Sequence, residues 1–460
     1  MLKDIKKIHF IGIGGSGMSA LANIMINLDC IVSGSDINKT EITEQLKKQG
    51  CKINLEHTKD NVKDVEIVVA SSAINNTNPE IIAAKENNIP IIHRSEVLAY
   101  LMKSRKSIAV AGAHGKTTTT SMIALMMEKA DLDPTIVIGG ELADINGSSK
   151  LGKGPYLIAE ADESDSSFLN LFFNICVITN IEDDHMDHYK SMSNILKAFK
   201  QFIEILPQNG VAIVCLDDKY IPGLIKEVNR KCISYAIENE AADYIARNIK
   251  TTSSYTTYDV FSKEKNLGTI KINIPGKHNV LNSLAAVATG FELKLSMEKI
   301  QANLDIFRGA KRRFQTKYKT DNLWIVDDYA HHPTEIKATL DGAKQTNPKR
   351  LICVFQPHRY SRTKHLYKEF GQSFTNADLL VLTDIYSAGE KPLEGVSTEL
   401  IIEEASQNSN QEIIYIKEKE NISDYLKKII MPGDLIITMG AGDIFKIGEE
   451  LKESLQNKPL

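Results

Sequence analysis

AVAGAHGKTTT, which occupies residues 109–119 of this 460-residue chain, joins a predicted strand to a predicted helix. The apolar run at 107–111 is typical of a buried strand, and residues 118–129 place apolar side chains at helical spacing. A glycine-rich turn between the two presents free backbone N–H groups and a helix dipole to anionic oxygens. We therefore expect Lys116 to reach the outer phosphates of a nucleotide and the Thr117 hydroxyl to bind Mg²⁺.

This turn departs from the standard phosphate-binding pattern at Val110, which stands where the first glycine is usual. An ordinary glycine-containing turn is the alternative interpretation, and the strand and helix on either side favour the nucleotide. The residues expected around the phosphates are Gly112, His114, Gly115, Lys116, Thr117 and Thr118.

Length and composition limit the class of protein. A chain of 460 residues is too long for one hydrophobic core, and about three domains are expected. Apolar residues make up 42% and charged residues 25%, which is usual for a soluble globular protein. The net charge of -4 gives no electrostatic basis for binding nucleic acid or a membrane surface, and no stretch has the length of a membrane span.

The cysteines and the first residues predict a cytoplasmic protein. The six cysteines are dispersed without a CxxC pair, so we expect reduced core residues. Basic residues 3–7 before an apolar stretch resemble a secretory signal, but the glycines at 12–17 would break its helix. Asp29 also fits no small-residue cleavage site.

GIGGSG at residues 12–17 lies between a predicted strand at 8–13 and a predicted helix at 18–27. It matches the GxGxxG pattern of diphosphate binding, and Asp36 follows where a ribose-binding acid is expected. NAD, FAD or a UDP-linked ligand would satisfy this pattern equally, since the backbone captures any diphosphate. After the next predicted strands come Ser71, Ser72 and the stretch 93–95, which are either ligand groups or solvated loop residues.

Acid-rich loops follow two strands of the predicted second domain. EADES at 160–164 follows the strand 156–159, and NIEDDHMDH at 180–188 follows the strand 175–179. Carboxylates and an imidazole at strand ends beside a phosphate turn can hold Mg²⁺. His185 alone would more often be structural, and its neighbouring acids favour a metal site.

Two later segments leave alternatives open. GKHN at 276–279 opens a helix on which His278, Asn279 and Asn282 can share a face, and these polar groups either contact an adenine or cap the helix. FRGAKRRF at 307–314 is either a solvated basic linker or a phosphate clamp, and it marks a domain boundary. Residues 251–274 alternate weakly and predict antiparallel hairpins at a sheet edge.

Four predicted strands of the last domain, at 323–326, 350–355, 379–382 and 435–438, all end in polar loops. Such clustering predicts a ligand crevice at the carboxyl ends of the strands. Arg359 and Arg362, three residues apart at a helix start, could hold a carboxylate. The polar loops are DDYAHHP at 327–333, QPHRYSR at 356–362, Asp384 with Tyr386, and GAGD at 440–443.

The chain resembles the Mur ligases throughout its length, and their alanine-adding branch in particular. GIGGSGMS, AGAHGKTTT, EADESD, GKHNVLN, DDYAHHPTE and QPHRYSRT carry this resemblance. It implies an α/β fold with three domains: a Rossmann-like UDP-sugar-binding domain (1–105), a central P-loop ATPase-like α/β domain (106–313) and a C-terminal Rossmann-like, amino-acid-binding α/β domain (314–460). The implied reaction joins L-alanine to the lactyl carboxylate of UDP-N-acetylmuramate through an acyl phosphate, with ATP and two Mg²⁺ ions, for peptidoglycan precursor synthesis.

The resemblance also implies roles for individual residues. Lys116 would hold the ATP phosphates, Thr117 and Glu160 one Mg²⁺, and His185 a second. The UDP sugar would meet Gly14, Gly15, Ser16, Gly17, Asp36, Ser71 and Ser72. The adenine and ribose would meet Asn279, Asn282, Arg313 and Asp328. Alanine would lie near Tyr329, His331, His358, Arg359 and Arg362.

Two further expectations concern proton transfer and a lysine. We expect the imidazole of His331 or His358 to help accept the proton of the attacking amine, because the pKa range of histidine suits that role. Several relatives carbamylate a lysine in the helix after the equivalent of His185. Lys200 is the candidate for that modification here, but alanine-adding members generally lack it.

Three other functions are compatible with parts of the sequence. A recycling ligase that attaches an intact tripeptide to the same sugar shares the HHP loop, but GGSGM and QPHRYSRT favour the alanine-adding branch. A dinucleotide oxidoreductase would explain residues 12–17 and leave the phosphate turn without a role. A non-catalytic nucleotide sensor would tolerate loss of the Mg²⁺-binding acids, which are all present. A monomer or weak homodimer is expected.

Overall fold

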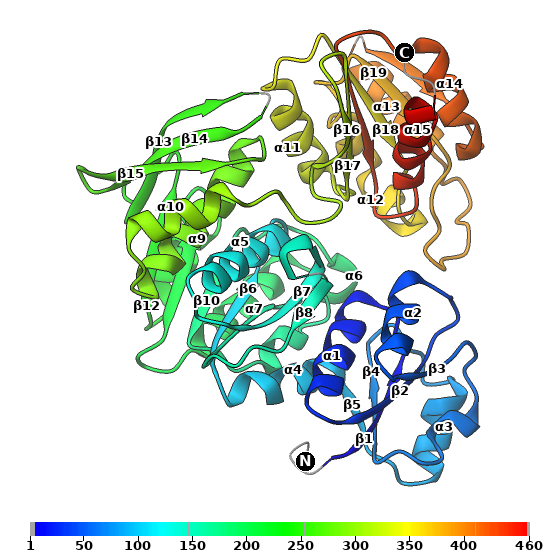
Figure 1. The fold of residues 1–460 in the computed structure, drawn as a ribbon. Coiled ribbons are helices and arrows are strands. Elements are labelled where there is room, and N and C mark those ends of the chain that lie inside the picture. Colours follow the sequence, from blue (N-terminus) through cyan, green and yellow to red (C-terminus); the bar gives the residue numbers. More distant parts are fainter. Residues whose placement is uncertain (1–4, 146, 253, 410, 458–460) are drawn as a thin grey trace. The chain divides into compact units, whose positions relative to one another are not determined.

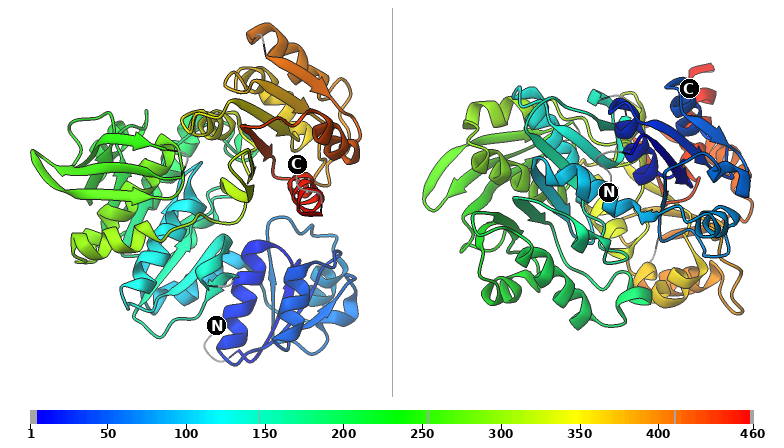
Figure 2. Two further views of the ribbon diagram at one scale, coloured as in Figure 1. Left: turned by 45° about the horizontal axis from the view of Figure 1, so that its top comes forward. Right: turned by 90° about the horizontal axis from the view of Figure 1, so that it is seen from below.

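The computed structural model describes residues 5–145, 147–252, 254–409 and 411–457, and it contains three β-sheets (Figure 1). Two compact units divide the chain. The first holds Met1–Arg247, Asp259–Gly268 and Leu281–Leu304, and the second holds Asn248–Tyr258, Thr269–Val280 and Asp305–Leu460. Further views show that helices flank the sheets (Figure 2).

The first sheet is parallel, with strand order β3-β2-β1-β4-β5. This order reverses direction next to β1, so the glycine turn of residues 12–17 leaves the sheet where open α/β folds bind dinucleotides. Its strands are β1 (Lys7–Ile11), β2 (Ile31–Ser35), β3 (Lys52–Asn54), β4 (Ile67–Ala70) and β5 (Ile91–His93). Its helices are α1 (Ser16–Asn27), α2 (Glu41–Lys48), α3 (Pro79–Glu86) and α4 (Arg94–Lys103).

The second sheet has ten strands in the order β15-β14-β13-β12-β11-β10-β6-β9-β7-β8. Its centre is parallel, with β6 between β10 and β9, and β8 runs antiparallel to β7. The segment expected as edge hairpins, 251–274, forms the last residue of β13 together with β14 and β15, and the strand order places β15 at the edge. The strands are β6 (Lys106–Ala111), β7 (Thr135–Leu142), β8 (Gly147–Lys150), β9 (Tyr156–Glu160), β10 (Ile175–Ile178), β11 (Val211–Cys215), β12 (Lys231–Ala236), β13 (Tyr244–Thr251), β14 (Thr256–Ser262) and β15 (Lys265–Ile272). The helices of this part are α5 (Lys116–Lys129), α6 (Met186–Tyr189), α7 (Met192–Glu204), α8 (Ile221–Leu224), α9 (Lys277–Glu292) and α10 (Met297–Asp305).

The third sheet has the order β16-β17-β21-β18-β19-β20, in which β16 alone among the described pairs runs antiparallel to its neighbour. The strands are β16 (Gln315–Lys319), β17 (Leu323–Asp328), β18 (Arg350–Phe355), β19 (Leu379–Leu382), β20 (Glu412–Tyr415) and β21 (Asp434–Met439). The helices are α11 (Pro333–Lys344), α12 (Tyr360–Gly371), α13 (Glu399–Asn408), α14 (Ile422–Ile429) and α15 (Phe445–Asn457).

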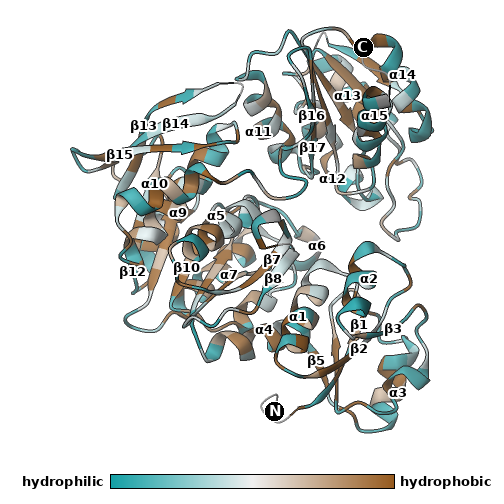
Figure 3. Cartoon of the chain, viewed as in Figure 1, coloured by the Kyte–Doolittle hydropathy of each residue, from teal (hydrophilic) through white to brown (hydrophobic). Residues whose placement is uncertain are grey.

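The central strands are buried on both faces, which explains why they are nearly continuous apolar runs. All residues of β4, β10, β11 and β19 are buried, and β10 is largely brown in Figure 3. Helix α5 is buried over residues 117–127 and lies against β7 and β9, so the phosphate turn rests on a rigid base. The mixed α/β fold with parallel sheets agrees with the sequence.

All six cysteines are free thiols, and Cys51, Cys176, Cys215 and Cys353 are buried. Burial raises the pKa of Cys51 to about 12, so its thiol stays protonated at neutral pH. Over the part of the chain that the structure describes, no helix combines the length and the apolar character needed to cross a bilayer.

Candidate functional site

The phosphate turn requires glycine at two positions. Gly112 has φ +136°, and Gly115, which precedes α5, has φ +82°. A Cβ on Gly112 would lie 2.1 Å from Oγ1 of Thr179, and a Cβ on Gly115 would lie 2.5 Å from Oδ1 of Asn282. Both positions therefore require glycine, because the backbone has positive φ and because a Cβ would collide with a neighbouring side chain.

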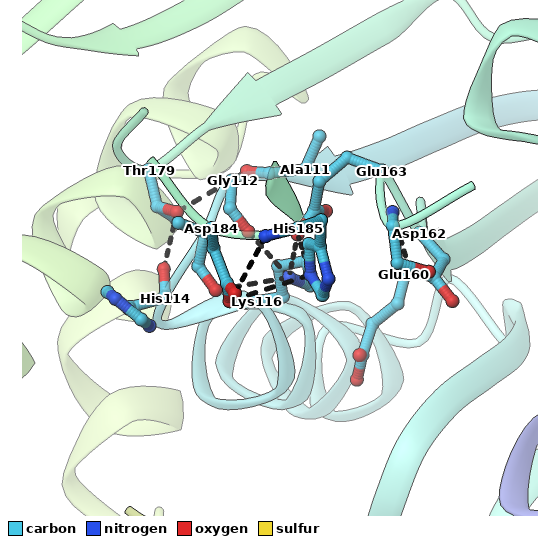
Figure 4. A network of polar contacts seen from close by, with 12 residues as sticks. Ala111, Gly112, His114, Lys116, Glu160, Asp162, Glu163, Thr179, Asp184 and His185 are labelled. Carbon is cyan, nitrogen blue, oxygen red and sulfur yellow. Dashed lines mark hydrogen bonds and ion pairs between the residues drawn. The ribbon is translucent and has the colours of Figure 1, made fainter. Parts of the chain in front are cut away.

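The peptide of His114 is held from the end of β10 (Figure 4). Its N–H donates to Asn180 Oδ1 at 2.8 Å. Its carbonyl oxygen accepts from Asn180 Nδ2 at 2.9 Å and from Thr179 Oγ1 at 2.6 Å. Sequence reasoning did not assign these two residues, although their position at the end of a strand that pairs with β6 is the signal that could have found them.

The ammonium of Lys116 points back toward its own turn and toward a carboxylate (Figure 4). Nζ donates to the Gly112 carbonyl at 2.6 Å and to Glu163 Oε1 at 2.7 Å. Burial alone would lower the pKa of Lys116, but the carboxylates of Glu163 and Asp162 raise it, so the side chain is cationic. Glu163 is 3% exposed, and burial raises its pKa to about 7.

Thr117 and Glu160 offer adjacent oxygens at the start of α5. Thr117 Oγ1 donates to Glu160 Oε2 at 3.2 Å, and the Gly139 N–H donates to Glu160 Oε1 at 2.7 Å. A hydroxyl and a carboxylate beside a phosphate turn are the hard oxygen donors that Mg²⁺ prefers. These residues therefore fit a Mg²⁺ ion.

His185 enters the same cluster from the loop after β10. Its Nε2 lies 3.5 Å from Asp184 Oδ2 and 3.8 Å from Glu163 Oε1, and its backbone has φ +56°. An imidazole among carboxylates also fits a cation. Lys200, on α7, donates instead to Glu227 Oε2 at 3.0 Å.

The glycine turn after β1 is shaped by Asp36. The Gly14 N–H donates to Asp36 Oδ2 at 2.9 Å, so this carboxylate holds the turn itself. Gly15 precedes α1, which begins at Ser16. A Cβ on Gly17 would lie 3.2 Å from Nη1 of Arg94, which places a cation beside the predicted diphosphate position.

Polar contacts join this first part of the chain to the acid loop after β9. Arg94 Nη2 donates to Asp162 Oδ2 at 2.5 Å, and Ser72 Oγ donates to Asp165 Oδ2 at 2.5 Å. Ser71, the other predicted serine, directly follows β4.

The residues expected around the adenine and ribose have defined local partners. Asn282 Oδ1 accepts from Thr119 Oγ1 at 3.1 Å, and Asn279 Nδ2 donates to the Pro275 carbonyl at 2.7 Å. Arg313 Nη1 lies 3.4 Å from Glu335 Oε1 in the second unit.

Asp328 shapes the loop that follows β17. Its carboxylate accepts from the N–H groups of Phe314 at 2.7 Å and Ala330 at 2.8 Å. Burial raises the pKa of Asp328 to about 6, even though the Arg313 guanidinium opposes this shift.

Four aromatic rings form a continuous series at the carboxyl ends of β17, β18 and β19. Tyr329 and His331 have ring centroids 5.3 Å apart, His331 and His358 6.0 Å, and His358 and Tyr386 5.6 Å. The last two rings are stacked, with an interplanar angle of 10°. The structure thus brings together residues of three loops that the sequence placed in one crevice, including Tyr386, which stacks on His358.

The two histidines of this series carry different tautomers. His331 Nδ1 lies 3.0 Å from the Tyr329 carbonyl and 3.2 Å from Glu335 Oε2, and both atoms accept hydrogen bonds. Its Nδ1 therefore carries a proton, and in the neutral form of the ring the lone pair lies on Nε2. His358 Nδ1 lies 3.3 Å from Nη1 of Arg362, which can only donate.

The His358 ring is neutral, with its proton on Nε2. Burial lowers its pKa to about 3, and the neighbouring His331, Arg362 and Arg359 add to this shift. Arg359 precedes α12 with φ +72° and ψ 136°, a conformation that a non-glycine residue rarely adopts.

Family models cover almost the entire chain. The Mur ligase family, catalytic domain matches residues 7–106, the Mur ligase middle domain matches 110–290, and the Mur ligase, glutamate ligase domain matches 312–442.

Known proteins resemble the chain over their full lengths. UDP-N-acetylmuramate--L-alanine ligases of Desulforamulus reducens and Pelotomaculum thermopropionicum are each 49% identical to it, and each alignment covers 98% of both chains. The crystal structure of UDP-N-acetylmuramate-alanine ligase from Thermotoga maritima superposes with a TM-score of 0.84 at 29% identity, over 98% of this chain and 99% of that one. With three consecutive domain matches and relatives of this identity along its whole length, the chain belongs to the Mur ligase family.

Proposed function

We propose that this chain joins L-alanine to the lactyl carboxylate of UDP-N-acetylmuramate, with conversion of ATP to ADP and phosphate. The observation that carries the proposal is the phosphate turn at the start of α5, where Lys116 donates to Glu163 and Thr117 donates to Glu160 of the acid loop. The full-length relatives named for this reaction supply the substrates. The proposed domains are 1–105 for the UDP sugar, 106–313 for ATP and 314–460 for the amino acid.

In the first step, an oxygen of the lactyl carboxylate attacks the γ-phosphorus of ATP. The bond from that phosphorus to the β,γ-bridging oxygen breaks, ADP leaves, and an acyl phosphate forms. Lys116 balances the negative charge that the two anionic reactants bring together, and Gly112 and Gly115 let the backbone approach the phosphates. Mg²⁺ held by Thr117 and Glu160, with a second ion at His185, would supply further charge neutralisation.

In the second step, the neutral amine of alanine attacks the activated carbonyl carbon. A tetrahedral species forms, the carbon–oxygen bond to phosphate breaks, and an amide remains. Arg359 and Arg362 hold the carboxylate of alanine. The amine proton passes to Nε2 of His331, because that atom carries the lone pair while Nε2 of His358 carries a proton.

The tautomers make an asymmetric prediction for the two histidines. His331→Gln should lower kcat by about 10²-fold or more at saturating alanine, as loss of a general base does. His358→Gln should mainly raise the KM for alanine, because its ring holds Arg362 and lines the crevice. Equal effects on kcat would contradict the assignment of the base to His331.

Phosphate release tests the function itself. The protein is supplied with ATP, Mg²⁺ and UDP-N-acetylmuramate, and separate reactions receive L-alanine, glycine, L-serine or L-Ala-D-Glu-diaminopimelate. We expect the fastest release with L-alanine, together with the matching amide. Release with the tripeptide alone would identify the recycling reaction, and no release with any acceptor would favour a nucleotide sensor. A cytoplasmic location and a monomer or weak homodimer belong to the same proposal.

A further inference from the structure

The loop after β19 closes on the start of α12, which bears the arginines of the amino-acid crevice. The Arg359 N–H donates to the Tyr386 carbonyl at 2.8 Å, and the Tyr386 N–H donates to the Pro357 carbonyl at 2.8 Å. Glu390 then reaches Ser361: Oε2 accepts from the Ser361 N–H at 3.0 Å and Oε1 accepts from Ser361 Oγ at 2.6 Å.

Helix α12 needs an acceptor from elsewhere. Its N-cap residue is Arg359, whose guanidinium can only donate, so it cannot satisfy the free N–H groups of the first turn. Glu390 supplies that acceptor from a distant part of the chain, and its negative charge also lies at the positive end of the helix dipole. The single carboxylate therefore replaces a local cap.

Two unusual backbone conformations show that this contact is constrained on both sides. Arg359 has φ +72°, and Ala388 has φ +50° immediately before Gly389 at φ +86°. The Glu390 N–H donates to the Ser387 carbonyl at 3.0 Å, which closes a tight turn that delivers Glu390 to Ser361. A non-glycine residue keeps positive φ only where its surroundings hold it there.

We infer that Glu390 is a positioning residue for the acceptor amino acid: by capping α12 through Ser361, it fixes the orientation of Arg359 and Arg362. Glu390 acts through the helix and touches no reacting atom. The inference rests on the proposed function, in which these arginines hold the carboxylate of alanine.

Steady-state kinetics of the full-length protein test this inference. Glu390→Ala should raise the KM for alanine about tenfold, the effect of losing a charged helix cap, and leave the KM values for ATP and UDP-N-acetylmuramate within about twofold. Glu390→Gln keeps one acceptor and should recover part of the loss. Ser361→Ala and Glu390→Ala should combine less than additively, because both remove the same contact.

Asp378→Asn is the matched control. The Asp378 carboxylate also accepts a backbone N–H, that of Leu351 at 2.7 Å. Asp378 directly precedes β19, at the ends of the strands away from the crevice. This variant should leave the KM for alanine unchanged. A similar rise in both variants, or no rise in Glu390→Ala, would overturn the inference.

Hydrogen exchange separates this inference from the proposed function. Amides in the first turn of α12 should exchange faster in Glu390→Ala than in the wild type, whichever acceptor the enzyme uses. Unchanged exchange would refute the capping role. A wild type that turns over another acceptor in place of alanine would refute the proposed substrate, and the KM comparison would then be made with that acceptor.

Discussion

Individual residues were predictable where one local motif determines them. Lys116, Thr117 and Glu160 follow from the turn and the acid loop. In the structure Thr117 Oγ1 donates to Glu160, and Lys116 Nζ donates to Glu163 of the same loop. Asn180 and Glu390 could not be assigned, because each acts on a segment that only the strand order brings near. A sequence shows which side chains can accept a hydrogen bond, but the partner depends on tertiary structure.

Asp328 makes a prediction about pH. Its pKa rises from an ordinary value of 3.8 to about 6 in the folded protein, so the folded state retains a proton that the unfolded chain loses. The stability from this group is complete below pH 3.8 and is lost as the pH rises through 6, by up to about 3 kcal/mol. The free energy of unfolding of Asp328→Asn relative to wild type should therefore increase between pH 4 and pH 6. Chemical denaturation measures it, with exposed Asp321→Asn as the control, and a constant difference would contradict the burial argument.

Secondary elements were predictable where they are central and buried. The runs at 107–111 and 379–382 correspond to β6 and β19, which have neighbours on both sides. The strands β3, β7, β8, β16 and β20 were not predicted, and all of them except β7, which lies between β9 and β8, are at a sheet edge. An edge strand has one strand neighbour and keeps a weaker apolar pattern, so periodicity alone does not reveal it.

The turn before α5 makes a prediction at this scale. Gly115→Ala would place a methyl group 2.5 Å from Asn282 Oδ1 on a backbone with φ +82°, so the turn must shift. We expect a loss of phosphate release of about 10²-fold or more, since small displacements at a positioned site have effects of that size. Gly223→Ala in α8 is the control, because a Cβ there meets nothing within 4 Å. Equal activity of the two variants would show that the turn tolerates displacement.

At the scale of the whole molecule, the substrates are assigned to different sheets, so their binding should be separable. Lys116→Ala removes the cation at the phosphate turn and leaves the glycine turn after β1 and its Asp36 contact untouched. Acyl phosphate formation should disappear, while calorimetry should show nearly unchanged binding of UDP-N-acetylmuramate. Loss of both would mean that the two sites do not belong to separate domains.

Arg94 is the expected exception to this separation. Its guanidinium lies beside Gly17 and donates to Asp162. The next residue, Glu163, accepts a hydrogen bond from Lys116. A diphosphate at the glycine turn would attract the same cation, so its arrival changes the charge balance around Asp162 and Lys116. Binding of the UDP sugar should consequently change the affinity for an ATP analogue in the wild type, and the ATP analogue should change the affinity for the UDP sugar by the same factor.

Arg94→Ala should abolish this coupling. Arg105→Ala is the control and should preserve it, because the Arg105 guanidinium donates to the nearby Leu101 carbonyl. Titration of each ligand in the presence and absence of the other measures the coupling, and a coupling that survives in Arg94→Ala would require another connection between the two sites.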